Sequence, residues 1–318
     1  MSPRDEIASS YSSANLPDLD VATAAPEKST IVRRKTGSPR RYLVFTSAGD
    51  RSNVRCWLEG RRNFDLWISY YGERPGHLAE IADFYNVRRD SKFGNLKFVY
   101  DTWPELLASY EAVLVSDDDV IISGAQISRL FELRQKLDQW LLQAAFSPLG
   151  KISWDITRAR WECSLRFTNF VEMTCPLFRK DKLDAFMQVF DPVLTGTGTD
   201  WWFMQSLGEN IEGKVAIVDA ITCVNPTDRT KGGVRECDRL DTEAERTAAW
   251  QRVRAQYGVD RRPQRELRRT LKPVPARWLS PIAHWPIDVY ARARSSAWLA
   301  KSKVVARLRR VATFPANL

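Results

Sequence analysis

Three consecutive aspartates, Asp117, Asp118 and Asp119, follow the apolar run Ala112–Val115 after a single serine. Crowded carboxylates repel one another, so such a cluster at a strand end needs a cation, a hydrogen-bond cage or open water. Oxygen ligands suit Mg²⁺ or Mn²⁺, and Mg²⁺ prefers one or two carboxylates together with waters and substrate phosphates. Side chains alternate along a strand, so Asp117 and Asp119 are expected to supply two ligands for one ion. The alternative is a solvated turn that caps the following helix.

The elements that would position these aspartates are apolar strands that alternate with helical stretches. Short strands are predicted at "YLVF" and "FDLWISYYG", and helices are predicted over residues 76–85 and 124–146. This alternation predicts an α/β fold, with a mainly parallel sheet sandwiched by helices. Ligands of such sheets lie beyond the carboxyl ends of the strands, so the "TSAGD" loop and the aspartates should open onto one crevice.

The glycine pattern near these strands narrows the class of ligand. Neither a GxGxxG nor a GxxxxGK[ST] loop lies close to them, which argues against a Rossmann dehydrogenase and a P-loop nucleotidase. A nucleoside diphosphate held through a metal ion is the remaining reading.

Composition divides the 318 residues into three parts. Residues 1–39 are rich in Ser, Pro, Ala and charge and are predicted to be a disordered tail. Residues 40–235 form the predicted catalytic domain, and residues 236–318 a basic, mainly helical C-terminal extension. From residue 251 onward there are 16 Lys and Arg against 3 Asp and Glu, whereas the rest of the chain has 32 against 36. The net charge of +9 therefore belongs to the extension, and the domain is not a general polyanion binder.

The cellular setting is predicted from what the sequence lacks. Five cysteines without a CxxC pair favour a reduced, cytoplasmic setting, and the N-terminus shows no signal-peptide pattern. No run of about 18 apolar residues occurs that could span a membrane. The basic amphipathic stretch 289–314 would hold the protein peripherally on the anionic inner face of the cell membrane, or would pack back on the domain. Both readings stay open.

Seven stretches, taken in order along the chain, resemble those of a known family. They are "YLVFTSAGD", "FDLWISYYG", "SKFGNLKFV", "VLVSDDDV", "RFTNFVEMTCPLF", "GTGTD" and "VAIVDAITCVNP". These are the glycosyltransferase-like proteins called domain of unknown function 707, which are similar to GT-A glycosyltransferases. The resemblance spans about residues 41–225. It implies a GT-A-like fold and a metal-dependent enzyme of the hexosyltransferase type.

The resemblance also implies roles for individual residues. Asp117 and Asp119 would match the DxD motif and hold Mn²⁺ or Mg²⁺ bridged to the donor diphosphate. In "GTGTD", Asp200 would be the general base for the acceptor hydroxyl in an inverting transfer, and Glu172 would lie near the acceptor. The implied donor-binding residues are Thr46, Ser47, Asp50, Lys92 and Asp118.

Each of three site residues also has a structural reading. Lys92 would be a solvated lysine, Asp200 a helix N-cap, and Glu172 a buried carboxylate paired with an arginine such as Arg166. Three positions depart from the family pattern. This chain has Thr197 where the family has tryptophan, and it has Trp154 and Asn225 where the family has histidine. Asn225 takes the place of a histidine that often completes the metal shell, and His77 and His284 are taken as structural or surface residues.

The predicted function is transfer of a sugar from a nucleotide-sugar donor to a glycan or lipid-linked acceptor, in the biosynthesis of a surface polysaccharide or glycolipid. The alternative is a non-catalytic nucleotide- or glycan-binding scaffold with a degenerate GT-A fold. Nucleic-acid binding has less support, because the tryptophans of the basic region form no recognised reading motif.

Overall fold

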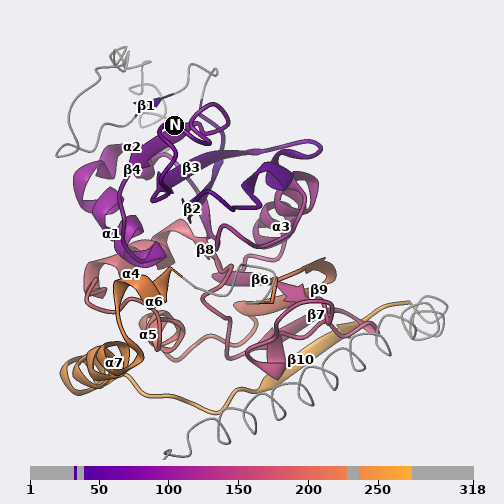
Figure 1. Cartoon of the computed structure of the whole chain (residues 1–318). Coiled ribbons are helices and arrows are strands. Elements are labelled where there is room, and N and C mark those ends of the chain that lie inside the picture. The colour runs from indigo at the N-terminus through magenta and orange to yellow at the C-terminus, as the bar shows by residue number, and fades with distance from the viewer. Residues whose placement is uncertain (1–31, 34–38, 228–235, 274–318) are drawn as a thin grey trace, which may run out of the picture.

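In the computed structural model, which describes residues 32–33, 39–227 and 236–273, ten strands form one sheet (Figure 1). The spatial order is β1-β4-β3-β2-β5-β8-β6-β9-β7-β10. The strands are β1 Val32–Arg33, β2 Tyr42–Ala48, β3 Phe64–Tyr70, β4 Phe84–Val87, β5 Ala112–Val115, β6 Leu141–Phe146, β7 Cys163–Thr168, β8 Leu177–Arg179, β9 Val215–Cys223 and β10 Glu266–Leu271.

Most strands of the sheet share one direction. Strands β2, β3, β4, β5, β6, β9 and β10 run one way, whereas β1, β7 and β8 run the other way. The sheet is therefore mixed and largely parallel, and the predicted α/β class is confirmed.

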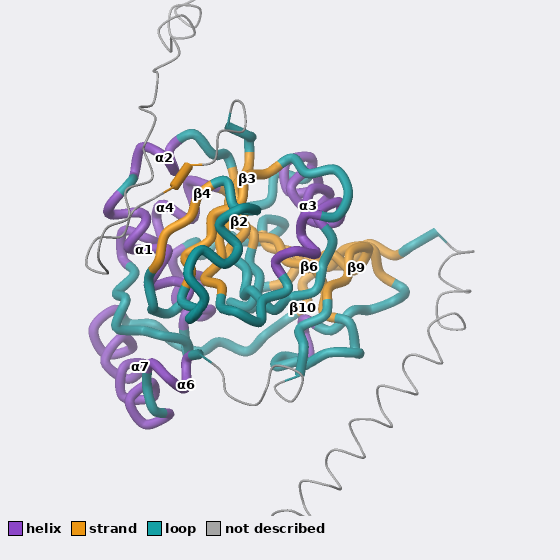
Figure 2. Tube along the Cα trace, turned by 45° about the horizontal axis from the view of Figure 1, so that its top comes forward, coloured by secondary structure: helices purple, strands orange, loops and turns teal. Residues whose placement is uncertain are grey.

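Helices cover both faces of the sheet (Figures 1 and 2). Along β2, Leu43 and Phe45 join one buried cluster and Tyr42 and Val44 join another, because successive side chains point to opposite faces. The first cluster includes side chains from α1, α2, α4, α5 and α7, and the second includes α3. The helices are α1 Lys92–Thr102, α2 Pro104–Ala108, α3 Gly124–Lys136, α4 Lys180–Val189, α5 Thr199–Ser206, α6 Cys237–Leu240 and α7 Glu243–Tyr257; two 3₁₀ turns are η1 Val54–Leu58 and η2 Asp155–Thr157.

One short strand joins the two halves of the sheet. The three residues of β8, Leu177–Arg179, pair antiparallel with β5 on one side and with β6 on the other. Strands β1–β5 lie in the half on the β5 side, and β6, β7, β9 and β10 lie in the other half. In Figure 1 these halves occupy the upper and lower parts of the picture, with β8 between them.

Two predicted helices differ from the structure. The helix predicted over residues 124–146 ends at Lys136, because Asp138 has a left-handed φ of 49° and Leu141–Phe146 forms β6. The helix predicted over residues 76–85 is wrong. Gly76 and Leu78 have φ values of 68° and 70°, and Phe84 begins β4. Neither left-handed residue fits a right-handed helix.

Both predicted flanking segments contribute a strand to the sheet. Val32 and Arg33, within the predicted tail, pair with β4. In the predicted extension, α7 contributes Ala249, Trp250 and Val253 to the core, and β10 pairs with β7. The rest of the tail and the predicted basic amphipathic helix lie outside the described residues. In the part that is described, no helix combines the length and apolarity needed to cross a membrane.

Candidate functional site

The carboxyl ends of several strands meet at one edge of the sheet. Strands β2, β3 and β5 are adjacent and parallel, so the loops that begin at Gly49, Tyr71 and Ser116 lie side by side. Strand β9 joins them through an isolated antiparallel bridge between Ile121 and Val224. This bridge places Asn225 alongside the segment that follows the aspartates. The structure thus brings the predicted metal ligands and the first-strand loop to one edge.

The three aspartates lie in a turn rather than in a strand. β5 ends at Val115, and the Val120 amide donates to the Asp117 carbonyl at 3.3 Å. The alternation that was expected to aim Asp117 and Asp119 together therefore does not apply. The turn does not cap the next helix either, because Ser123 caps α3 through a capping box with Gln126.

The aspartate turn is tied to the first-strand loop by hydrogen bonds. The Gly49 amide donates to Asp118 Oδ2 at 2.9 Å. The Asn53 amide donates to the Asp118 carbonyl at 2.7 Å, and Asn53 Nδ2 donates to the Asp119 carbonyl at 2.6 Å. These bonds hold the two loops in a fixed relation, as a preorganised binding edge requires.

Lys92 lies within the site but is not solvated. It is the first residue of α1 and is only 8% exposed. Its Nζ contacts Asp117 Oδ1 at 2.7 Å and donates to the Met173 and Thr174 carbonyls at 2.6 and 3.1 Å. These three oxygens match the three donors of an ammonium group. The solvated reading is thus wrong, and the phosphate contact stays a prediction that would require this arrangement to open.

The predicted donor-binding residues of the first strand differ in accessibility. Thr46 is fully buried, and Ser47 accepts a 2.8 Å hydrogen bond from Asn95 Nδ2. Asp50 accepts hydrogen bonds from the Tyr70 hydroxyl, the Glu73 amide and Arg74 Nε. The Tyr70 hydroxyl, followed by these other donors, lowers the pKa of Asp50 well below its usual range. Asp50 therefore stays ionised and shapes the loop, whereas Ser47 is buried within β2.

Tyr71 is a member of the site that the sequence reasoning missed. Burial raises its pKa, and the charges of Asp118, Glu236, Asp119 and Asp117 raise it further. The phenol is therefore neutral and lies among the carboxylates. Tyr71 directly follows β3, so the strand-end rule that singled out the aspartates could have found it. A Cβ added to Gly49 would lie 2.6 Å from the Tyr71 ring, so a larger residue there would displace the phenol.

The side chains at this edge fit a hard divalent ion in donor type. Asp117, Asp118, Asp119 and Asn225 offer only carboxylate and amide oxygens, which Mg²⁺ and Mn²⁺ accept. Across residues 32–33, 39–227 and 236–273, no group of three or more His, Cys, Asp or Glu side chains is arranged to hold a metal. An ion bound here would therefore need oxygens from water and phosphate as well, as is usual for Mg²⁺.

Glu172 is a buried carboxylate behind the aspartate turn. It is 4% exposed, and Oε1 accepts a 2.8 Å hydrogen bond from the Thr174 hydroxyl. Burial raises the pKa of Glu172, and the charge of Asp117 raises it further. The reading that pairs Glu172 with Arg166 is wrong, because Arg166 Nε and Nη2 donate to Asp219 at 2.8 and 3.0 Å.

Asp200 lies in the first turn of α5 and is also buried. The helix N-cap is Gly198, so the N-cap reading of Asp200 is wrong. Burial is the main cause that raises the pKa of Asp200 to about 7, and the charge of Glu172 adds to it while the Trp201 amide and Arg261 oppose it. A carboxylate with a pKa near neutrality suits a general base.

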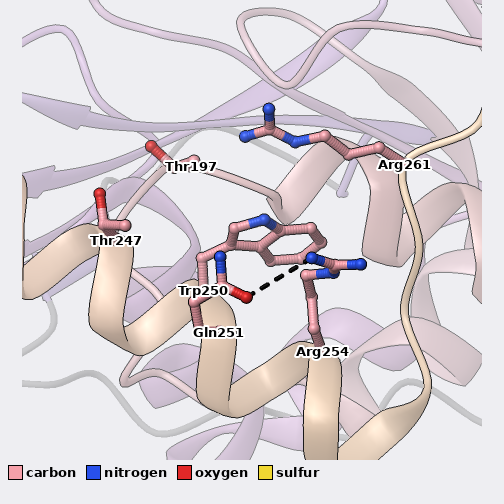
Figure 3. A pocket seen from close by; sticks show the side chains of 6 residues that line it. All are labelled: Thr197, Thr247, Trp250, Gln251, Arg254 and Arg261. Atoms are coloured by element: carbon pink, nitrogen blue, oxygen red, sulfur yellow. Dashed lines mark hydrogen bonds between the residues drawn. The ribbon is translucent and has the colours of Figure 1, made fainter.

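A cavity of about 330 Å³ lies near the start of α5, the helix that carries Asp200 (Figure 3). Its lining residues are Thr197, Thr247, Trp250, Gln251, Arg254 and Arg261. Four of them share one face of α7, and Thr197 precedes α5. The sequence reasoning missed Trp250, Arg254 and Arg261. It carried no signal for them beyond a tryptophan in a charged helix.

Gly198 holds the cavity wall together and allows a direct test. Its φ is 95°, and an added Cβ would lie 2.1 Å from Trp250 Cε3. We expect Gly198→Ala to lower the free energy of unfolding by at least about 2 kcal/mol, because it combines backbone strain with a clash. Gly196→Ala is the matched control, since a Cβ there meets nothing within 4 Å. Urea unfolding measures both, and equal stabilities would contradict the assigned packing.

Two of the positions that depart from the family pattern lie around Asp200. Trp154 packs against Phe170 and Trp201, with ring centroids 5.6 and 6.0 Å apart. Thr197 lines the cavity, where a tryptophan would fill space. His77 lies near Arg74 and Tyr70 at the back of the first-strand loop, and His284 lies outside the described residues.

Comparison with known proteins finds similarity only at the level of solved structures. No family model and no curated protein matches the chain, so membership of the domain of unknown function 707 family is not confirmed. Residues 1–349 of S. aureus TarS in complex with UDP are 11% identical over 67% of this chain and 71% of that one, with a TM-score of 0.45. The same segment with UDP-GlcNAc is 11% identical over 68% and 73%, with a TM-score of 0.43. GalNAc-T7 with UDP, GalNAc and Mn²⁺ is 10% identical over 60% of this chain and 44% of that one, with a TM-score of 0.44. At these levels the comparisons carry no argument about activity, which must be argued from the site itself.

Proposed function

We propose that this protein is a glycosyltransferase that moves a sugar from a nucleotide-sugar donor to an acceptor hydroxyl. The observation that supports this most is the arrangement of the strand-end loops. Hydrogen bonds from Gly49 and Asn53 fix the aspartate turn beside the first-strand loop, and the bridge between Ile121 and Val224 places Asn225 alongside it. These loops offer oxygen ligands for a metal-bound diphosphate, and Asp200, whose pKa burial raises to about 7, is the candidate base for the acceptor.

The residues divide into a donor side and an acceptor side. On the donor side, the backbone of the Gly49 loop, Tyr71 and the aspartate turn would hold the nucleoside diphosphate. On the acceptor side, Asp200 would take the proton of the attacking hydroxyl. That oxygen bonds to the anomeric carbon while the bond from this carbon to the diphosphate oxygen breaks. The products are the glycoside with inverted configuration, the nucleoside diphosphate and a protonated Asp200.

The predicted metal ion would be held by Asp117, Asp119 and Asn225, with Asp118 beside them. When bound, it would supply electrostatic stabilisation of the leaving diphosphate. The negative charge of Glu172 on the acceptor side would help to hold the pKa of Asp200 near neutrality.

Thermal stabilisation by ligands tests the donor side. We expect a cognate nucleoside diphosphate with Mn²⁺ to raise the melting temperature, because a ligand at 100 times its Kd adds about 2.7 kcal/mol. Asp119→Asn is expected to abolish this shift. Asp101→Asn, which removes an exposed charge paired with Lys97, should leave it intact. The measurement is a melting scan over a panel of nucleotides with Mn²⁺, Mg²⁺ or a chelator.

An undiminished shift in Asp119→Asn would show that the metal role of this side chain is wrong. Release of the diphosphate from a nucleotide sugar then separates the enzyme from its alternative. Binding without release would support the non-catalytic scaffold.

A further inference from the structure

The cavity near the start of α5 carries two arginines, and, within the described part of the chain, neighbouring acidic side chains pair with only one of them. Arg254 and Arg261 each lie with the guanidinium carbon 5.9 Å from the Trp250 ring centroid. Figure 3 shows them on either side of the indole, with Thr197 and Thr247 at the other end of the cavity. Arg254 pairs with Asp260 at 2.6 Å, and both side chains are exposed. Among the described residues, Arg261 forms no ion pair.

We propose that this cavity binds an anionic group of the acceptor, a phosphate or a carboxylate carried close to the hydroxyl that receives the sugar. The inference rests on the proposed function in one respect, which is that the bound molecule is the acceptor. The assignment of an anion site to the cavity stands on the geometry of the two arginines.

The first argument is the charge of the cavity without a ligand. Two guanidinium groups that face one indole repel each other, and the exposed Asp260 offsets only one of them. An anion in the cavity would offset the positive charge that Asp260 leaves unbalanced. Arginine forks match phosphate and carboxylate oxygens in geometry as well as in charge.

The second argument is the position of the cavity relative to Asp200. Gly198 packs on Trp250, and Thr197 lines the cavity only three residues before Asp200. Arg261 acts on both, because it lines the cavity and is close enough to lower the pKa of Asp200. An anionic acceptor brought next to a carboxylate base needs a cation between the two negative groups. Arg261 fills that role.

The third argument is size and the nature of the wall. A volume of about 330 Å³ is at the lower end of ligand cavities and suits a single sugar or polyol with its anionic group, rather than a nucleotide sugar. The Thr197 and Thr247 hydroxyls and the Gln251 amide offer hydrogen bonds to hydroxyl groups. Gln251 Oε1 also accepts from Arg254 at 3.4 Å, which orients that guanidinium.

Binding measurements on the full chain test the proposal without any donor. Calorimetric titration with inorganic phosphate, glucose 1-phosphate, glucuronate and glucose compares anionic ligands with a neutral one. We expect at least one anionic ligand to bind about tenfold or more tightly than glucose. Arg261→Gln should weaken that binding about tenfold. Arg262→Gln is the matched control, because Arg262 is the next residue, is exposed and does not line the cavity, and it should change binding less than about twofold.

A second experiment distinguishes a lipid headgroup from a soluble or glycan-borne group as the source of the anion. Vesicles of phosphatidylglycerol or of phosphatidylcholine are sedimented with the chain and with both variants. Sedimentation with phosphatidylglycerol that falls in Arg261→Gln but not in Arg262→Gln would assign the anion to a lipid headgroup. Binding of the soluble phosphates or of glucuronate with the same variant pattern would assign it to a soluble or glycan-borne group.

Three results would overturn the proposal: glucose binding as well as the anions, Arg261→Gln leaving all anion binding unchanged, or both arginine variants losing it equally. These results are separable from failure of the proposed function, because the nucleotide shifts that depend on Asp119 are measured without an acceptor. A chain that keeps those shifts and fails here retains the donor site and loses only the anion assignment.

Discussion

Asp200→Asn is expected to remove the transfer step while leaving the donor bound. Loss of a positioned general base typically lowers a rate by about 10² to 10⁴ fold, and the amide keeps the size of the side chain. In the unsubstituted protein the rate should rise with pH and level off above about 7, because burial raises the pKa of Asp200 to about 7. The measurement is diphosphate release from a nucleotide sugar with and without acceptor.

The same substitution removes activity but is expected to raise the stability of the folded protein, relative to the unsubstituted protein, as the pH rises. The folded pKa of Asp200, about 7, lies above the usual aspartate value of about 3.9, so the folded state binds the proton more tightly. The resulting stabilisation is complete below about pH 4 and is lost as pH rises toward 7. Between pH 4 and 8, Asp200→Asn should therefore gain up to about 4 kcal/mol relative to the unsubstituted protein.

Urea unfolding at several pH values measures this relative gain. Asp101→Asn is the control, because its exposed ion pair with Lys97 should affect neither activity nor the pH dependence. A variant that loses activity but shows no relative gain at high pH would contradict the raised pKa assigned to Asp200. Full activity in the variant would contradict its role as the base.

Lys92→Met is expected to destabilise the fold by about 3 kcal/mol. The substitution leaves the Met173 and Thr174 carbonyls without their donor and Asp117 without its cation. Methionine keeps the apolar stem that fills the space beside Phe93. The free energy of unfolding from urea titration gives the effect, and Lys97→Met, at a more exposed position on α1, is the control.

A double-substitution cycle separates the ion pair from the carbonyl contacts. Because the Asp117 side chain is 40% exposed, its own share should be small, and Asp117→Asn should cost less than about 1 kcal/mol. Lys92→Met combined with Asp117→Asn should then cost about as much as Lys92→Met alone. Destabilisation of Lys92→Met by less than about 1 kcal/mol would show that the buried ammonium is not structural.

Local pattern was enough to predict the strands that carry the site. β2, β3, β5 and β9 are mostly apolar runs, each followed within two residues by glycine, aspartate or asparagine, and the placement of β2, β3 and β5 at one edge follows from parallel pairing. The bridge between Ile121 and Val224 could not be predicted in this way, because it joins residues about a hundred positions apart. The same holds for Arg166, whose partner proved to be Asp219 and not Glu172.

The surroundings of individual side chains were the least predictable part of the site. Whether Lys92 meets solvent or three protein oxygens depends on where Met173 and Thr174 come to lie, which no local pattern contains. The cavity is a similar case. Trp250 and Arg261 belong to a charged segment that looks solvated in the sequence, and only the packing of α7 on Gly198 places them near the start of α5.

The short strand β8, which joins the two halves of the sheet, has a consequence for the order in which the chain folds. All partners of the parallel pairs among β2, β3, β4 and β5 lie within residues 42–115, so that half can assemble from contacts of short sequence separation. β6 and β9, by contrast, must find each other across some seventy residues. Because β8 pairs with both halves, it can complete its ladder only after each has formed. We therefore expect docking of this three-residue strand to be a late event that brings the aspartate turn and the Asp200 helix into register.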